Sequence, residues 1–209
     1  MIRLTRLRTW RGRSISPGAL AATFFIAGSL GFGVWQLGHG LYIEAKAVLA
    51  QHLLNRAWTQ TLADQDGQPG THKPWPWADT WPVAKLELPR LHSSTIVLAG
   101  ASGEAMAFGP GHLAGTPAPG DPGTSVIAAH RDTHFAAIKD LEPGDEIRVT
   151  RADGTHYLFR VSHMRVVRAG ASGIDPYAGG QTLALVTCYP FGATKQGPLR
   201  YVVIANAAF

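Results

Sequence analysis

Apolar and polar positions divide the chain of 209 residues into parts with different periodicities. Residues 18–34 carry no charged side chain, and the apolar stretch continues to Trp35 and Leu37. About 20 apolar residues of helix cross the hydrocarbon core of a bilayer, so residues 18–38 predict a transmembrane anchor. Apolar positions then recur at near-helical spacing among Ala, Gln and Glu, which predicts a helical stalk over residues 39–62.

From residue 81 onward the pattern changes to short β-branched and aliphatic runs separated by turns that contain glycine or proline. These runs predict strands at residues 83–88, 95–99, 124–129, 145–151, 157–167, 182–188 and 199–205. Short helical turns are expected at 105–108 and 135–140. Many short strands without long helices between them predict an all-β sandwich or barrel over residues 81–209.

Residues 63–80 predict a linker, because they begin with a polar cluster rich in turn-forming residues. Trp75, Trp77 and Trp81 follow, together with two prolines. Leaving so much aromatic surface in water is unfavourable. We therefore expect this segment to pack against the following domain or against a membrane interface.

The positive charge of the chain is concentrated at its start. Five arginines and no acid lie in residues 1–13, and without them basic and acidic residues are equal in number. The neutral remainder argues against a nucleic-acid-binding surface. The positive-inside rule predicts a basic leader, residues 1–17, in the cytoplasm, with the rest of the chain outside. A cleaved signal peptide is the alternative, but no small-x-small cleavage site stands out and the span is longer than a usual signal core.

The chemistry of the chain centres on its only cysteine, Cys188, at the end of the run 182–188. One cysteine forms no internal disulfide and leaves a free thiol. If this run pairs antiparallel with 199–205, Cys188 faces Arg200, and a guanidinium beside a thiol favours the nucleophilic thiolate. The ordinary alternative is a small buried cysteine packed in a sheet.

His130 stands at the end of another predicted strand, where an imidazole near the thiol could act as general acid and base. His134 follows at i+4, so a zinc site with Cys188 has to be considered. The turn residues between the two histidines and the lack of a further ligand argue against it. No loop gathers enough acids to predict a calcium site, so we expect no cofactor and leave calcium modulation open.

Three separated motifs resemble those of sortases, the membrane-anchored cysteine transpeptidases. The run Thr182-Leu183 … Leu185-Val186-Thr187-Cys188 resembles their Thr-Leu-x-Thr-Cys signature, Ala129-His130-Arg131-Asp132-Thr133 resembles their histidine strand, and Leu199-Arg200 matches their arginine. The resemblance covers roughly residues 80–209, and the Trp/Pro segment resembles the proteobacterial, marine branch. The chain departs at Ala129, where the family usually has glycine, and at Val186 within the signature.

The resemblance implies an eight-stranded sortase-type β-barrel with short helices, on the outer face of the inner (cytoplasmic) membrane. It also implies that the Cys188 thiolate attacks the Thr–Gly bond of a Leu-Pro-x-Thr-Gly-like sorting signal on a partner protein and passes the acyl group to an amine. His130 would be the acid and base, and Arg200 would hold the substrate or the oxyanion. Weaker candidates for the oxyanion hole or for orienting groups are Thr187, Asp132 and Asp175. The alternatives are a hydrolytic cysteine protease with the same residues and a non-catalytic, membrane-tethered domain that binds peptides.

Overall fold

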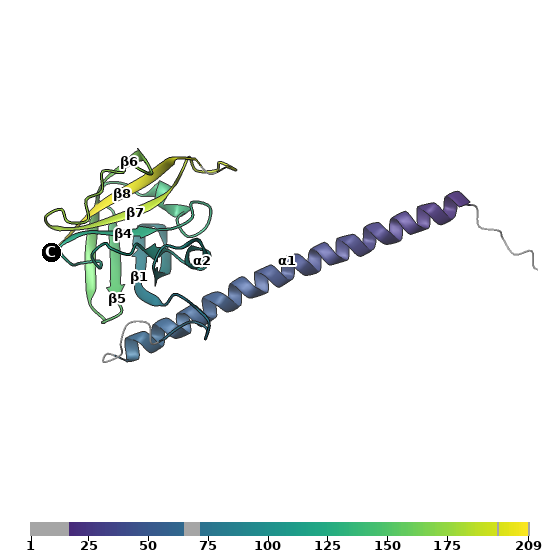
Figure 1. Cartoon of the computed structure of the whole chain (residues 1–209), viewed down its shortest axis with the longest axis horizontal. Helices are drawn as coiled ribbons and strands as arrows, with labels where there is room; N and C mark the ends of the chain where they lie inside the picture. The colour runs from purple at the N-terminus through teal and green to yellow at the C-terminus, as the bar shows by residue number, and fades with distance from the viewer. Residues whose placement is uncertain (1–16, 65–71, 196, 209) are drawn as a thin grey trace, which may run out of the picture. The chain divides into compact units, whose positions relative to one another are not determined.

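A computed structural model describes residues 17–64, 72–195 and 197–208. A long helix, α1 (Pro17–Ala63), precedes a closed β-barrel, whose connections contain the short helical elements η1 (Pro89–Leu91), α2 (Gly103–Met106) and η2 (Ala137–Asp140) (Figure 1). The barrel strands are β1 (Pro82–Leu88), β2 (Ser93–Ala99), β3 (Gly111–His112), β4 (Gly123–Ala128), β5 (Glu146–Arg151), β6 (His156–Arg168), β7 (Gln181–Tyr189) and β8 (Leu199–Ala207). The expectation of an eight-stranded barrel is therefore confirmed.

The strands follow one another around the barrel in the order β1-β2-β3-β4-β7-β8-β6-β5. Most neighbours are antiparallel, but β2 pairs with β3 and β4 pairs with β7 in parallel. The sheet closes on itself, although β3 pairs with only two residues of β2 and two of β4. The parallel β4–β7 pair brings together two segments that are far apart in the sequence, and the site depends on it.

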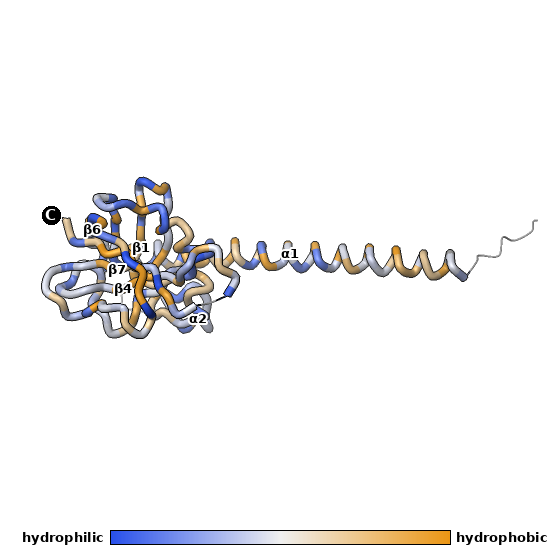
Figure 2. The backbone as a smooth tube through the Cα atoms, turned by 90° about the horizontal axis from the view of Figure 1, so that it is seen from above, coloured by the Kyte–Doolittle hydropathy of each residue, from blue (hydrophilic) through white to orange (hydrophobic). Residues whose placement is uncertain are grey.

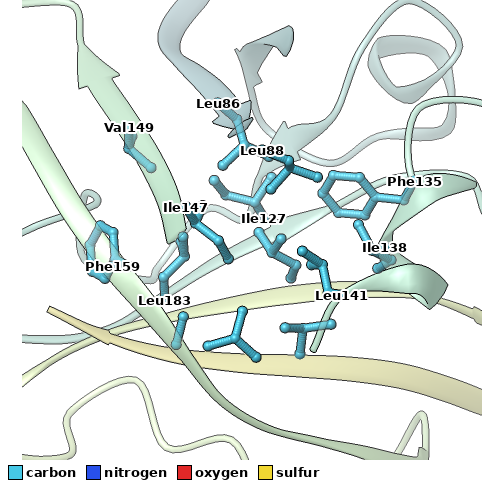
Figure 3. Close-up of a cluster of buried hydrophobic side chains, with 14 of the residues drawn as sticks. Leu86, Leu88, Ile127, Phe135, Ile138, Leu141, Ile147, Val149, Phe159 and Leu183 are labelled. Atoms are coloured by element: carbon cyan, nitrogen blue, oxygen red, sulfur yellow. The ribbon is translucent and has the colours of Figure 1, made fainter. Parts of the chain in front are cut away.

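The core fills the barrel interior because every second residue of each strand points inward. β1 shows this alternation directly, with Ala84, Leu86 and Leu88 buried and the residues between them half-buried. Phe135 and Ile138, from the segment after β4, are fully buried in the same cluster (Figure 3). The segment that follows His130 is therefore anchored in the core.

The first part of α1, which contains the predicted anchor at residues 18–38, is mainly apolar, and the helix is long enough to cross a membrane. Phe24, Phe25 and Leu30 are 77%, 77% and 66% exposed, and hydrophobic residues recur along this part in Figure 2. A helix that is apolar all round needs an apolar environment, which a bilayer supplies. The leader, residues 1–17, lies outside the described residues except for Pro17, the first residue of α1.

The chain divides into two compact units between Lys46 and Ala47, within the predicted stalk. The last part of α1 belongs to the same unit as the barrel: Leu54 and Trp58 are 1% and 6% exposed and pack with Ile96 and Leu98 of β2. Residues 47–62 of the predicted stalk therefore pack with β2, and the stalk as a separate part, residues 39–62, stays a prediction.

The Trp/Pro segment packs only in part against the domain. The Trp75 ring meets Phe108 edge to face, with centroids 4.8 Å apart. The Thr80 hydroxyl donates to the Ala99 carbonyl at 2.8 Å, which ties the end of the segment to β2. Trp77 remains 83% exposed. Most of the polar linker, residues 65–71, lies outside the described residues.

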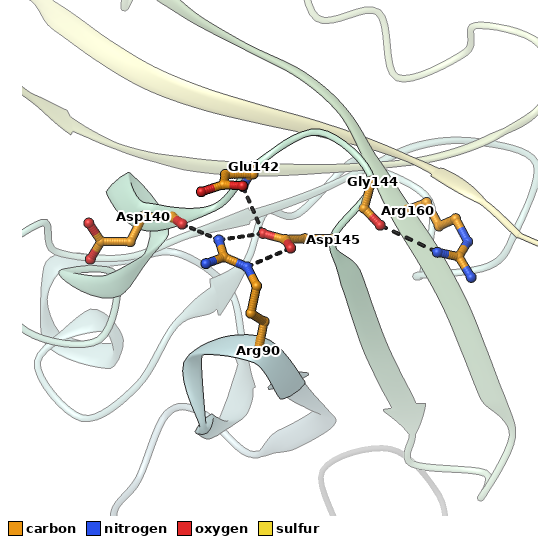
Figure 4. A network of polar contacts seen from close by, with 6 residues as sticks. All are labelled: Arg90, Asp140, Glu142, Gly144, Asp145 and Arg160. Carbon is orange, nitrogen blue, oxygen red and sulfur yellow. Dashed lines mark hydrogen bonds and ion pairs between the residues drawn. The ribbon is translucent and has the colours of Figure 1, made fainter.

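A polar network fixes the connection between η2 and β5 (Figure 4). Arg90, in the 3-10 turn η1 (Pro89–Leu91), donates from Nε and Nη2 to the two carboxylate oxygens of Asp145 at 2.6 and 2.7 Å, and Nη2 also contacts the Asp140 carbonyl. The Glu142 N–H donates to Asp145 Oδ2 at 2.7 Å. The hydrogen bond from Arg90 is the main reason that the pKa of Asp145 is lowered.

Candidate active site

Three adjacent strands bring His130, Cys188 and Arg200 to the same level of the barrel wall. Cys188 of β7 is paired directly with Arg200 of β8, as the antiparallel pairing predicts. On the other side of β7, Ala128 of β4 is paired with Val186, and the Ala129 N–H donates to the Val186 carbonyl at 3.2 Å. The strand pairing ends there, and His130 and Cys188 each lie two residues further along their chains, from which we infer that they are level with each other. Figure 1 shows β4, β7 and β8 as neighbours in this part of the wall.

The alternation along β7 decides which face of the wall carries the thiol. Leu183, Leu185 and Thr187 are buried on the barrel-interior side, whereas Ala184 and Val186 belong to a second apolar cluster on the opposite side. Cys188 continues the second set, so its side chain is on the outer face of the wall. Arg200, directly opposite, shares that face.

The accessibility of the three residues suits chemistry on a bound molecule. The Cys188 thiol is free and half-buried, and His130 is exposed. Arg200 is half-buried, and its Nη1 donates to the carbonyls of Gly197 and Leu199, each at 2.8 Å. A fully buried packing cysteine, the ordinary alternative, does not match this exposure.

The β6–β7 connection covers the outer face of the wall beside His130, Cys188 and Arg200, which together we call the row. Ile174 packs on the outer apolar cluster formed by Val126, Ala184 and Val202. The Gly123 N–H donates to the Gly180 carbonyl at 2.7 Å. Gly123 has φ +114°, and a Cβ there would lie 2.3 Å from the Pro176 carbonyl oxygen, so only glycine allows this close approach.

Thr187 holds the chain that carries His130. Its hydroxyl donates to the Ala129 carbonyl at 2.7 Å, and the residue is 2% exposed. A hydroxyl has one hydrogen to donate. An oxyanion role for Thr187 stays a prediction, and it would require this bond to break.

The two weaker acidic candidates have other partners in the structure. The Asp132 carboxylate lies 3.4 Å from Nε of Arg131. Asp175 accepts a hydrogen bond from the Tyr177 N–H at 2.9 Å, which closes a turn in the β6–β7 connection. No hydrogen bond from His130 to either carboxylate is found within the described residues. Their proposed roles stay predictions.

His134 lies close enough to His130 for the two charges to interact. Burial is the main cause that lowers the pKa of His134, repulsion from His130 adds to it, and a hydrogen bond with the Ala107 backbone partly opposes both. His134 is therefore neutral over a wider pH range than an ordinary histidine. Within residues 17–64, 72–195 and 197–208, no three His, Cys, Asp or Glu residues gather in a way that could hold a metal ion. The expectation that the site holds no metal stays a prediction.

One residue of the site was missed as a functional candidate. Arg131, directly after His130, is 7% exposed. Arginine is usually a surface residue, and Arg131 follows the strand in a turn, so no periodicity marks it as buried. The only available signal was its position inside the histidine motif.

A model of the sortase domain family matches residues 86–208, which include β2 to β8 and all three residues of the row. The chain belongs to the sortase family. The sequence-based resemblance to the family is confirmed, whereas the proteobacterial, marine branch stays a prediction.

Relatives agree with this family. Sortase D of Bacillus subtilis (strain 168) is 29% identical over 119 residues, which span 56% of this chain and 60% of that protein. The crystal structure of sortase C-1 from Actinomyces oris superposes with a TM-score of 0.55 at 27% identity, covering 61% of this chain and 74% of that one. A sortase D5 transpeptidase from Clostridium perfringens shares the fold, with a TM-score of 0.60 at 18% identity over 76% of this chain and 99% of that one.

Proposed function

We propose that this sortase is a membrane-anchored transpeptidase whose nucleophile is Cys188. The observation that carries the proposal is the pairing of Cys188 with Arg200 across β7 and β8, with His130 two residues beyond Ala128, which pairs with Val186 of β7. A nucleophile, an acid–base group and a cation at one level of a wall are the parts that acyl transfer needs.

The first half of the reaction forms a thioester. The Cys188 thiolate attacks the threonine carbonyl carbon of a Leu-Pro-x-Thr-Gly-like sorting signal on a partner protein. The C–N bond to glycine breaks, and the His130 imidazolium gives its proton to the leaving amine. The exposure of His130 lets the leaving peptide depart into solvent.

The second half transfers the acyl group. An amine acceptor attacks the thioester carbonyl, neutral His130 takes the proton of that amine, and the C–S bond breaks to restore the thiolate. Every proton and electron pair in both halves comes from Cys188, His130 or the substrates. We therefore propose that the reaction uses no cofactor.

Arg200 would stabilise the oxyanion that forms on the threonine carbonyl. Within the described residues its hydrogen bonds all leave from Nη1 and go to Gly197 and Leu199. A guanidinium has five N–H donors, so Nε and Nη2 remain for the substrate. A fixed cation in a partly dry site is worth most where negative charge develops.

The first part of α1 would anchor the enzyme in the inner (cytoplasmic) membrane. The exposed apolar side chains of this part suit lipid, and the arginines of residues 1–13 suit the cytoplasmic side. The barrel then works on the outer face. The likeness of the Trp/Pro segment supports placing the protein in the proteobacterial branch.

Hydrolysis by the same residues is the second candidate, because exposed His130 leaves the thioester open to water. The test uses the full chain in detergent micelles, a labelled Leu-Pro-x-Thr-Gly peptide and mass spectrometry of the products. We expect a thioester adduct on Cys188, loss of that adduct in Cys188→Ala with peptide binding retained, and a hydroxamate product only when hydroxylamine is added as the nucleophile. Unchanged turnover in Cys188→Ala would refute both candidates, and a carboxylic acid product at all amine concentrations would favour hydrolysis.

A further inference from the structure

Arg131 is a buried cation beside the row. Its side chain is 7% exposed, and among the described residues it is the one charged residue in the buried class. Removing a guanidinium from water is costly unless hydrogen bonds and a counter-charge replace the solvent. The hydrogen-bond and ion-pair partners of the Arg131 guanidinium therefore indicate its role.

These partners join two distant segments. Nη2 donates to the carbonyls of Ala193 and Lys195, the latter at 3.2 Å, and both carbonyls belong to the connection between β7 and β8. Nε lies 3.4 Å from Oδ2 of Asp132, whose side chain is 64% exposed. The turn after His130 is thus bound to the connection after Cys188.

The same connection also holds Arg200. Arg200 donates to the Gly197 carbonyl at 2.8 Å, two residues after Lys195. One end of the connection continues from Cys188, its middle is bound by Arg131, and its far end is bound by Arg200. A displacement of this connection would therefore move Cys188 and Arg200 relative to His130.

Stability alone does not account for this arrangement. Nη1 of Arg131 is buried and lacks a hydrogen-bond partner within the described residues, and buried Nε has only the Asp132 carboxylate, at an ion-pair distance of 3.4 Å. An unsatisfied buried donor is destabilising, and an apolar side chain of similar volume would often give a protein that is as stable or more stable. Because a buried guanidinium with unsatisfied donors destabilises the fold, we look for a role of Arg131 beyond packing.

We propose that Arg131 is a positioning residue, which holds the β7–β8 connection against the His130 turn and so fixes Cys188 and Arg200 relative to His130. The inference rests on the proposed function for its catalytic consequence. A guanidinium suits the task because one nitrogen reaches two carbonyls while another faces a carboxylate, which the single ammonium of lysine does not reproduce.

The test compares Arg131→Met and Arg131→Lys with the matched control Arg148→Lys, all in the full chain in detergent. Arg148 is 58% exposed on β5, where its guanidinium pairs with Glu146 at 3.1 Å, away from the row. Turnover is normalised to the active sites titrated by thioester formation, which removes any loss that comes only from misfolded protein. Amide hydrogen exchange of residues 189–199 is measured in parallel.

We expect Arg131→Met to lower kcat per active site by roughly 10- to 100-fold, the cost of misplacing reacting groups by about 1 Å, with KM nearly unchanged. Arg131→Lys should lie between it and the wild type, and Arg148→Lys should match the wild type. Exchange in residues 189–199 should accelerate in Arg131→Met while exchange in β5 and β6 stays the same.

Two results would overturn the inference: wild-type protection of residues 189–199 in Arg131→Met, or faster exchange there with an unchanged kcat per active site. If Arg131→Met does not fold, the same criteria apply to Arg131→Lys. The exchange measurement needs no substrate. It therefore tests whether Arg131 holds the β7–β8 connection even if the wild type turns over no peptide. That last outcome would refute the proposed function instead.

Discussion

Replacing Thr187 by valine removes one buried hydroxyl and keeps the shape of the side chain. The hydroxyl donates to the Ala129 carbonyl at 2.7 Å from a residue that is 2% exposed. Valine leaves that carbonyl without its donor where water has little access. Since Ala129 directly precedes His130, the change should loosen the chain that presents the imidazole to Cys188.

The expected cost follows from the burial. A buried acceptor left unsatisfied costs about 1–3 kcal/mol of unfolding free energy. For a domain of 150–250 residues, each kcal/mol lowers Tm by about 2–4 °C. We therefore expect a Tm lower by roughly 2–12 °C, and a kcat reduced by about tenfold through displacement of His130.

The assay compares Thr187→Val with Thr187→Ser in the full chain. Serine keeps the hydroxyl but loses a methyl group from the barrel interior, which costs about 1 kcal/mol. Near-UV circular dichroism follows the melting of the barrel, and peptide turnover gives kcat. If the hydroxyl matters, serine should retain most of the activity that valine loses, although both variants are less stable than the wild type.

Two results would refute this reasoning. Wild-type kcat in Thr187→Val would show that the bond to Ala129 does not hold His130 in place. Equal loss of kcat in the valine and serine variants would show that retaining the hydroxyl does not preserve activity, and that the hydrogen bond to Ala129 is not what sets kcat.

Three further substitutions test the catalytic cation, an ion pair and the helix–barrel contact. Arg200→Lys should lower kcat by roughly 10- to 100-fold, because a point charge cannot replace the planar fork at the oxyanion; near-normal kcat would contradict that role. Asp145 has a lowered pKa, chiefly through its hydrogen bond from Arg90, so its contribution to stability is present above a pH of about 4 and is lost as pH falls through the folded pKa. Denaturant unfolding should therefore show Asp145→Asn less stable than the wild type at pH 7 and the gap closing below about pH 4, and a gap independent of pH would contradict this. Leu54→Ala should cost about 2–5 kcal/mol because Leu54 is 1% exposed against β2, whereas Leu49→Ala, 56% exposed, is the control expected within about 0.5 kcal/mol of the wild type; equal melting of the two variants would contradict packing of the helix on the barrel.

The sequence predicts most strands of the barrel because their β-branched runs are long and bounded by turns. It does not predict β3, which has two residues, Gly111 and His112, and no periodicity. β3 is a strand because its two residues pair with Leu98 and Ala99 of β2 on one side and with β4 on the other. A Cβ on Gly111 would lie 2.1 Å from the Gly100 carbonyl oxygen, so close backbone approach selects glycine there.

The site is predictable where local pairing decides it. Cys188 and Arg200 belong to one hairpin, so their contact follows from two neighbouring strand patterns. The position of His130 beside Cys188 depends on a parallel pair between distant strands, which motif resemblance indicates but periodicity does not. The burial of Arg131 is beyond sequence reasoning, because the carbonyls that bind it come from a connection whose path depends on the whole barrel.

The parallel pairing of β4 with β7 has a consequence for how such a protein diversifies. Cys188 is set in the wall by the register of β7 with β4 and β8, and a slip of one residue in β7 would turn it toward the barrel interior. The β6–β7 connection is tied to the same wall, because the Thr124 N–H donates to the Pro176 carbonyl at 3.0 Å and Ile174 packs on the outer apolar cluster. Changes in this connection are therefore expected at its exposed positions, such as Tyr177, which is 84% exposed, and not at the positions that contact β4.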